Sequence, residues 1–426
     1  MPKRRKKINS FQKQKLAKAH HKKEFLRKLE LFVNTICGQD TFSILPNDII
    51  EELYTERAHS FKVVVADDSR VSSQVIKDTR VILPNMMRKD KITIVQGKLE
   101  VTLEEFYTVC ISIRLLHDDL KDENLSYAVQ FKKGMKRFIK NFENLYSQAA
   151  ERLNQILRTF CIINSDLGKY LFWAEYKLVP VPAPRCGIDN IITLYQTETE
   201  LVSVELEGNS RPARRIGFAF PEDGPDWINL KPSQLNIQGP FAQIPLNVYI
   251  QSHALQRLSE RIDCFETGVV HFNTYLSLKV PHVVRDNQKN ILLEFRVFDT
   301  KAGYFMATVV AGMIIIRTFL FITNSGTPEG EKLEKITGLQ KLDKKYLAID
   351  KLSTFMDSDI KENEEIQRIF ENAGCKCLID LYEKMQPIVS KHGNPLDTNL
   401  MLNYLESHGG STSNSLAAGA LLKAFS

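Results

Sequence analysis

Apolar and polar positions recur along this chain with two different periods, so the sequence predicts both strands and helices. Alternating or β-branched runs predict strands at 61–67, 79–84, 91–101, 191–206, 214–220, 275–284, 290–298, 304–310 and 313–323. Spacings of three and four predict helices from about Lys15, after Thr102, over 124–160, over 252–263, from Thr327 to Gly338, and over 344–390. The fold class expected is α+β.

The chain of 426 residues is too long for one compact core. Alternating prolines at 180–184 extend the backbone and forbid helix, which predicts a linker there. We expect helical N- and C-terminal regions to flank a domain made of one helix and an antiparallel sheet. The segments expected are a basic arm (1–30), a mainly helical domain (31–180), a β- and loop-rich connector (181–247), the α+β domain (248–340) and a helical region with a tail (341–426).

The composition is that of an ordinary soluble protein, with 43% hydrophobic and 25% charged residues. Seven scattered cysteines form no disulfide framework and fit a reducing cytosol, so a cytoplasmic location is expected. The most apolar stretch, 304–323, is long enough to span a bilayer. Because it is rich in β-branched residues and has Ala311-Gly312 in its middle, it predicts two strands joined by a tight turn, and no membrane is expected as a partner.

The net charge of +6 has an uneven distribution. Residues 1–30 hold 12 lysines and arginines against Glu24 and Glu30, a balance of +10, whereas the other 396 residues have 45 basic and 49 acidic side chains. Such a run neutralises phosphates and attracts nucleic acid without regard to sequence, although a solvated tail explains it equally well. The arm residues assigned to nucleic acid are Lys3, Arg4, Arg5, Lys6 and Lys7.

The segment Ser252–Ile262 predicts a short helix with two chemically distinct faces. His253, Arg257, Glu260 and Arg261 fall on one side, while Leu255, Leu258 and Ile262 fall on the other. Ser252 is expected to cap this helix. A polar helix face is most often only solvated surface, but this face is pure, and the strands that follow supply further cations at Arg285, Arg296 and Arg317.

These residue types suit cleavage of RNA without a metal. Such cleavage needs a group that moves protons to and from the 2′-hydroxyl and the leaving oxygen, and fixed positive charge on the phosphate. His253 can act as the acid or base because its ordinary pKa lies near neutrality. Arg257 and Arg261 can each hold a phosphate through two hydrogen bonds. Glu260 can serve as a base or orient an arginine.

The pattern Ser-x-His-Ala-x-x-Arg-x-x-Glu-Arg, followed by an antiparallel meander, resembles the BrnT/RelE-like toxins of the barnase–EndoU–colicin–RelE group. The resemblance covers about residues 248–325. It implies a metal-independent ribonuclease with no cofactor, whose site includes His253, Arg257 and Glu260 or Arg261. It also implies a hydroxyl on a late strand, for which Thr323 or Thr318 is the candidate, and an antitoxin-like partner.

Two other functions stay open. In one, a non-enzymatic protein uses the same fold and the basic arm to bind RNA or the ribosome. In the other, the C-terminal helices over 344–390 bind a partner protein. Two further clusters have the simpler interpretation. His117-Asp118-Asp119 is expected to be polar surface at a helix end, and Cys375-Lys376-Cys377 a reduced pair, so no metal is expected.

Overall fold

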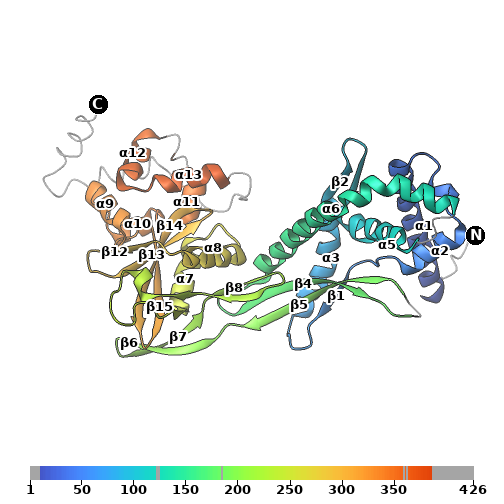
Figure 1. The fold of residues 1–426 in the computed structure, drawn as a ribbon. Coiled ribbons are helices and arrows are strands. Elements are labelled where there is room, and N and C mark those ends of the chain that lie inside the picture. Colours follow the sequence, from blue (N-terminus) through green and yellow to red (C-terminus); the bar gives the residue numbers. More distant parts are fainter. Residues whose placement is uncertain (1–9, 121–124, 184–185, 358–359, 361–362, 386–426) are drawn as a thin grey trace, which may run out of the picture. The chain divides into compact units, whose positions relative to one another are not determined.

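The computed structural model describes residues 10–120, 125–183, 186–357, 360 and 363–385 (Figure 1). The chain forms two compact units. Unit 1 comprises Met1–Phe160 and Trp173–Gln196, and unit 2 comprises Cys161–Phe172 and Thr197–Ser426. The α+β class is confirmed, because helices flank a large, mostly antiparallel sheet in unit 2.

Helices dominate unit 1. Its elements are α1 (Ser10–Cys37), a 3-10 turn (Phe42–Ile44), α2 (Asn47–Glu56), β1 (Lys62–Val65), α3 (Ser73–Lys89), β2 (Lys91–Val95), β3 (Leu99–Thr102), α4 (Leu103–Glu105), a π-helical turn (Phe106–Cys110), α5 (Ile111–Asp119), most of α6 (Ser126–Asn164), and the greater part of β4 (Tyr170–Pro180) and β5 (Ile188–Glu198). The strands β1, β5 and β4 form a sheet in that order. The hairpin expected at 91–101 and the capping box at Thr102 are confirmed.

The core of unit 1 forms where α6 packs on α1. Phe131, Met135 and Phe138 lie one turn apart on α6 and are buried. The rings of Phe32 and Phe138 meet edge to face, with centroids 5.1 Å apart. Phe25 and Leu29 of α1 are buried as well. The end predicted for the basic arm, at residue 30, therefore falls inside a helix that contributes to the core of unit 1.

Unit 2 is built on a sheet with the strand order β12-β13-β14-β15-β11-β7-β6. These strands are β6 (Leu201–Leu206), β7 (Asn209–Arg215), β11 (Leu246–Gln251), β12 (Val283–Arg285), β13 (Ile291–Val297), β14 (Thr300–Val310) and β15 (Met313–Phe321). The short β10 (Asn229–Leu230) also pairs with β11, β8 (Gly217–Phe220) and β9 (Gly224–Trp227) form a separate hairpin, and Pro232–Leu235 is a 3-10 turn. All pairings in this sheet are antiparallel except that of β11 with β15.

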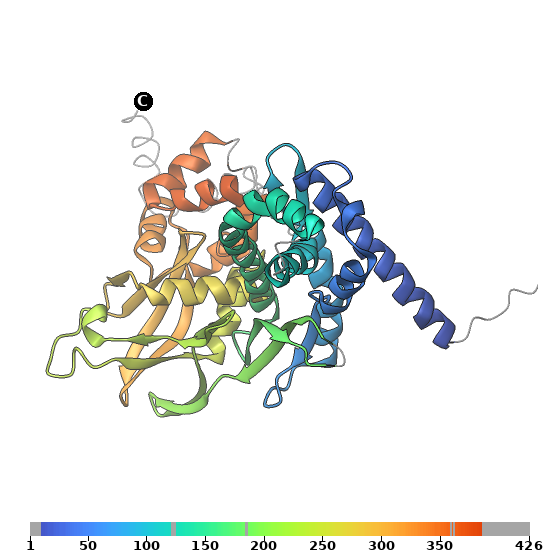
Figure 2. The same cartoon turned by 45° about the vertical axis from the view of Figure 1, so that its right-hand side comes forward.

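Two groups of helices cover this sheet. α7 (Ser252–Arg261) packs on β15, and α8 (Thr267–Lys279) packs on β13. The C-terminal helices, drawn in orange and red in Figure 2, gather near one end of the sheet. They are α9 (Pro328–Thr337), α10 (Lys341–Tyr346), α11 (Leu352–Asp357), α12 (Glu364–Ala373) and α13 (Lys376–Met385).

Two predicted strands are wrong. Residues 275–284 contain the end of α8, whose side chains are buried on nearly all sides, so no polar face shows the helical period. Residues 79–84 lie inside α3, although Pro84 argues against a helix interior. The two strands expected over 304–323 are confirmed as β14 and β15, and both Ala311 and Gly312 between them have positive φ. Among the described residues, no helix is long and apolar enough to cross a membrane.

The connector predicted over 181–247 is not a separate segment. Pro180 is the last residue of β4 and Pro182 follows it, whereas Pro184 lies outside the described residues. Because β4 and β5 are neighbours in one sheet, the segment after Pro180 connects two paired strands. β6 and β7 extend the large sheet of unit 2, because β7 pairs with β11. A cluster of Val204, Ala213, Tyr249 and Ile315 joins these strands through side-chain packing.

Gly268 lies where α8 approaches the end of α6. A Cβ at this position would lie 1.7 Å from the carbonyl oxygen of Ile162, so only glycine fits. Substitution Gly268→Ala is therefore expected to lower the free energy of unfolding by about 2 kcal/mol or more, through overpacking. Urea unfolding followed by circular dichroism measures this change.

Gly168→Ala is the matched control. Its Cβ would meet the nearest atoms, of Asp166 and Leu255, at 3.5 and 3.6 Å, which is ordinary contact. We expect a change within about 0.5 kcal/mol. Equal stability of the Gly268→Ala and Gly168→Ala variants would contradict the close approach of α8 to Ile162.

Candidate nucleic-acid interfaces

The two-faced helix predicted after residue 251 is present as α7. Ala254, Leu258 and the following Ile262 are buried, whereas His253 is exposed. Ser252 is the first helical residue and does not cap the helix; the N-cap position belongs to Gln251, whose side chain makes no capping hydrogen bond. The structure therefore presents His253 to solvent on a helix held by its apolar side.

Arg257 and Glu260 neutralise each other on this helix. Their side chains form an ion pair of 2.7 Å, and Gln256 donates a second hydrogen bond to Glu260 at 2.8 Å. Slight desolvation acts to raise the pKa of Glu260, but the hydrogen bonds from Gln256 and Arg257 outweigh it and lower that pKa. A carboxylate held in its charged form in this way is a poor general base, so its role as an orienting partner of Arg257 fits the geometry better.

Arg261 is an internal anchor. Its guanidinium forms an ion pair with the carboxylate of Asp350 and donates a hydrogen bond of 3.0 Å to the Asp350 carbonyl. The Asp350 side chain is only 3% exposed and that of Arg261 14%. Close by, the carboxylate of Asp263 accepts hydrogen bonds from the backbone and the hydroxyl of Ser353. The end of α7 thus fastens the segment that leads into α11, and Arg261 does not have the free guanidinium that a phosphate clamp requires.

Thr323 is also part of this anchor rather than of an open site. Its side chain is fully buried, and its hydroxyl donates a hydrogen bond of 2.7 Å to the carbonyl of Ile349. Thr318, the alternative hydroxyl, is half-buried on β15. On α7 the structure therefore leaves His253 exposed and Arg257 half-buried, whereas Arg261 and Thr323 are held in internal contacts.

The three strand arginines assigned to nucleic acid have separate partners. Arg285 on β12 donates to the carbonyls of Lys289 and Leu235, at 3.0 and 3.1 Å. Arg296 on β13 pairs with Glu294 at 2.7 Å, and Arg317 on β15 pairs with Glu207 at 2.6 Å. Because each cation has its own local partner, the structure shows no shared cationic surface built from these three side chains.

The two polar clusters fit their simpler interpretation. Asp118 forms an ion pair with Arg114 and lies 3.3 Å from the ring of His117. Burial raises the pKa of the Cys377 thiol to about 11 and that of Cys375 further, which disfavours the thiolate form that binds zinc. Within the described parts of the chain, no group of three or more His, Cys, Asp or Glu side chains could hold a metal ion.

The first half of α6 carries a row of cations that the sequence analysis missed. Its polar face contains Lys132, Lys133, Lys136, Arg137 and Lys140, with no acidic residue among them. All of these except the half-buried Lys132 are exposed, and none forms an ion pair with another described residue. The run Lys-Lys-x-x-Lys-Arg in the sequence is the signal that could have found them, since the apolar residues around it recur at helical spacing.

α1 adds to the basic character of the same unit. Figure 2 shows its N-terminal part extending away from the rest of unit 1, and Lys15, Lys18 and Lys23 are exposed there. Near the other end of α1, a Cβ on Gly134 of α6 would lie 2.6 Å from Cys37, so the two helices are in close contact. The arm cations Lys3, Arg4, Arg5, Lys6 and Lys7 lie outside the described residues.

Compared with known proteins, the chain matches no family model, no curated protein and no solved structure. The interpretation of these surfaces therefore rests on their own chemistry.

The anchoring role of Arg261 predicts a large loss of stability on its removal. Arg261→Ala would leave the carboxylate of Asp350 buried without its cation, and we expect a loss of about 3–5 kcal/mol in the free energy of unfolding. Adding Asp350→Asn to this variant should recover part of the loss. Urea unfolding of the single and double variants measures both effects.

Arg257→Ala is the control on the same helix. Its partner Glu260 is 38% exposed, so the change is expected to stay within about 1 kcal/mol. If Arg261→Ala is as stable as Arg257→Ala, Arg261 is not an anchor and its assignment as a phosphate ligand regains support.

Proposed function

We propose that this protein binds RNA through the basic surface of α1 and α6 in unit 1, without cleaving it. The observation that carries the proposal is the contrast between two sets of cations. Arg261, Arg296 and Arg317 in unit 2 are neutralised by carboxylates, whereas the cations on the first half of α6 have no acidic partner among the described residues. Unpaired cations on one face bind phosphates and release counterions.

The arrangement of these cations disfavours the helix that carries them. Lys133 and Arg137 are four residues apart, as are Lys136 and Lys140, and like charges at this spacing destabilise a helix by about 0.2–0.5 kcal/mol per pair. A bound polyanion removes this repulsion. The surface is therefore better suited to a complex with RNA than to the free protein.

The apolar side of α6 argues against a lipid surface as the partner. Membrane-surface helices insert an apolar face between lipid headgroups. In α6 that face, with Phe131, Met135 and Phe138, is buried in the core of unit 1. Only the charged face remains available, and lysines on a helix surface contact the phosphate backbone rather than base edges.

Metal-independent RNA cleavage by α7 is the second candidate. His253 is exposed and forms no hydrogen bond or ion pair with any described residue, and Arg257 lies one turn further along the helix. The order of α7, α8 and the antiparallel strands β12–β15 supports the likeness to the RelE-like toxins. The internal hydrogen bonds of Arg261 and Thr323 weigh against it, because they make two of the five residues assigned to catalysis unavailable to a substrate.

Removing three charges from α6 tests the first candidate. In Lys133→Gln/Lys136→Gln/Lys140→Gln the helix propensity is nearly unchanged, so unit 1 should keep its fold. We expect the slope of log affinity against log salt concentration to fall by about 2 to 3, with weaker binding at low salt. Fluorescence anisotropy with a labelled 5′-hydroxyl RNA at several salt concentrations measures this.

A matched control removes three exposed charges from unit 2, as Lys332→Gln/Lys335→Gln/Lys345→Gln. It has the same net charge, so an equal loss of affinity in both variants would contradict a localised surface. The same reactions, run on a gel, test cleavage. RNA fragments that form with the wild type but not with His253→Ala would overturn the non-enzymatic proposal in favour of the ribonuclease.

A further inference from the structure

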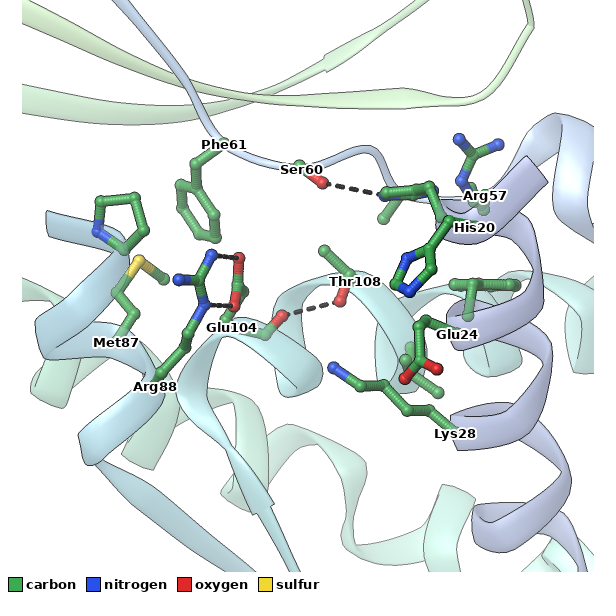
Figure 3. A pocket seen from close by; sticks show the side chains of 15 residues that line it. His20, Glu24, Lys28, Arg57, Ser60, Phe61, Met87, Arg88, Glu104 and Thr108 are labelled. Atoms are coloured by element: carbon green, nitrogen blue, oxygen red, sulfur yellow. Dashed lines mark hydrogen bonds and ion pairs between the residues drawn. The ribbon is translucent and has the colours of Figure 1, made fainter. Parts of the chain in front are cut away.

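Unit 1 contains a cavity of about 590 Å³ that is separate from the row of cations on α6. Four segments form it (Figure 3). They are α1, the loop after α2 (residues 57–61), α3, and the α4 and π-helical turn (residues 104–109). This volume lies within the range of pockets that hold small molecules. The side chains that line it divide into a polar set and an apolar set.

The polar set is rich in hydrogen-bond donors. Figure 3 shows His20, Glu24 and Lys28 reaching from α1 toward the cavity. Next to them, His21 lies 3.4 Å from the hydroxyl of Ser60. The Lys28 ammonium uses one donor on Glu105, at 3.0 Å, and keeps others for a ligand.

The acidic side chains at the cavity already have partners. Glu104 forms two hydrogen bonds with Arg88, of 2.7 and 3.3 Å, and Glu24 pairs with Arg27 at 3.2 Å. Burial and the nearby cation of Arg57 lower the pKa of His21, with Glu104 acting against them and Lys28 with them. The cavity is therefore an environment in which an added anion is favourable.

The apolar set provides a surface for a flat group. Pro84 and Met87 of α3 line the cavity together with Phe61. An edge contact with Tyr107 and a tilted contact with Tyr176, at centroid distances of 5.4 and 5.7 Å, hold the ring of Phe61 in place. A ring held in this way can stack on a planar ligand with little loss of conformational entropy.

We propose that this cavity binds a nucleoside 5′-monophosphate group, with the phosphate held by Lys28 and His21 and the base lying against Phe61 and Met87. The same chemistry occurs in a free nucleotide and at the 5′ end of an RNA chain. The proposal does not depend on the α6 surface, because the residues that line the cavity do not include the α6 cations.

Calorimetry with adenosine 5′-monophosphate tests the proposal. We expect saturable binding to the full-length protein, at least ten-fold weaker binding of adenosine, and at least ten-fold weaker binding of the nucleotide to Lys28→Gln. Lys28→Arg should restore most of the affinity. Lys23→Gln is the matched control, because Lys23 is an exposed lysine of the same helix that does not line the cavity.

Several outcomes would overturn the site. They are the absence of binding at millimolar nucleotide, equal affinity for nucleotide and nucleoside, or an unchanged affinity in Lys28→Gln. If Lys28→Gln does not fold, His21→Gln makes the same comparison, since within the described part of the chain the His21 ring forms one hydrogen bond, with Ser60. Comparing 5′-phosphorylated with 5′-hydroxyl RNA then separates the two sources: tighter binding of the phosphorylated chain assigns the cavity to RNA ends, and equal binding assigns it to free nucleotides.

Discussion

The parallel pairing of β11 with β15 is the constraint on which unit 2 depends. Val248, Tyr249 and Ile250 pair with Ile314, Ile315 and Ile316, which are some 65 residues further along the chain. A parallel pair needs a long crossover, and here the crossover consists of α7, α8 and the strands β12 to β14. Because β15 pairs with β11, α7, which directly follows β11, packs on β15, and its polar side faces outward. β7 pairs with the other edge of β11, so the same strand also joins β6 and β7 to the sheet.

This constraint explains why the polar side of α7 has two different kinds of residue. His253 and Arg257 lie toward the start and middle of the helix and remain accessible. The end of the helix meets the segment that leads to α11, and there Arg261 meets Asp350. A side chain that looks catalytic in the sequence is thus part of the attachment of the C-terminal helices. Buried ion pairs of this kind give a segment a specific place, since misplacement would leave a charge unpaired.

The cations of the molecule are used in two ways. In unit 2 those assigned to nucleic acid neutralise local carboxylates or bind backbone carbonyls. In unit 1 the first half of α6 has a row of cations without an ion-pair partner among the described residues, and the cavity beside α1 combines hydrogen-bond donors with an apolar wall. The features on which the two proposals for a nucleic-acid ligand rest therefore belong to unit 1 and not to the segment 248–325.

The sequence by itself determined the elements whose signal comes from residues close together in the chain. The two faces of α7, the hairpin at 91–101, the capping box at Thr102 and the turn at Ala311-Gly312 all follow from near neighbours in the chain. The tertiary structure alone decided which distant residues surround each element. α8 has no polar face because unit 2 surrounds it, and Arg261 has a role only through a partner 89 residues away. Whether a charged side chain is neutralised depends on which distant side chains the fold brings next to it. The spacing of residues along one helix cannot predict those partners.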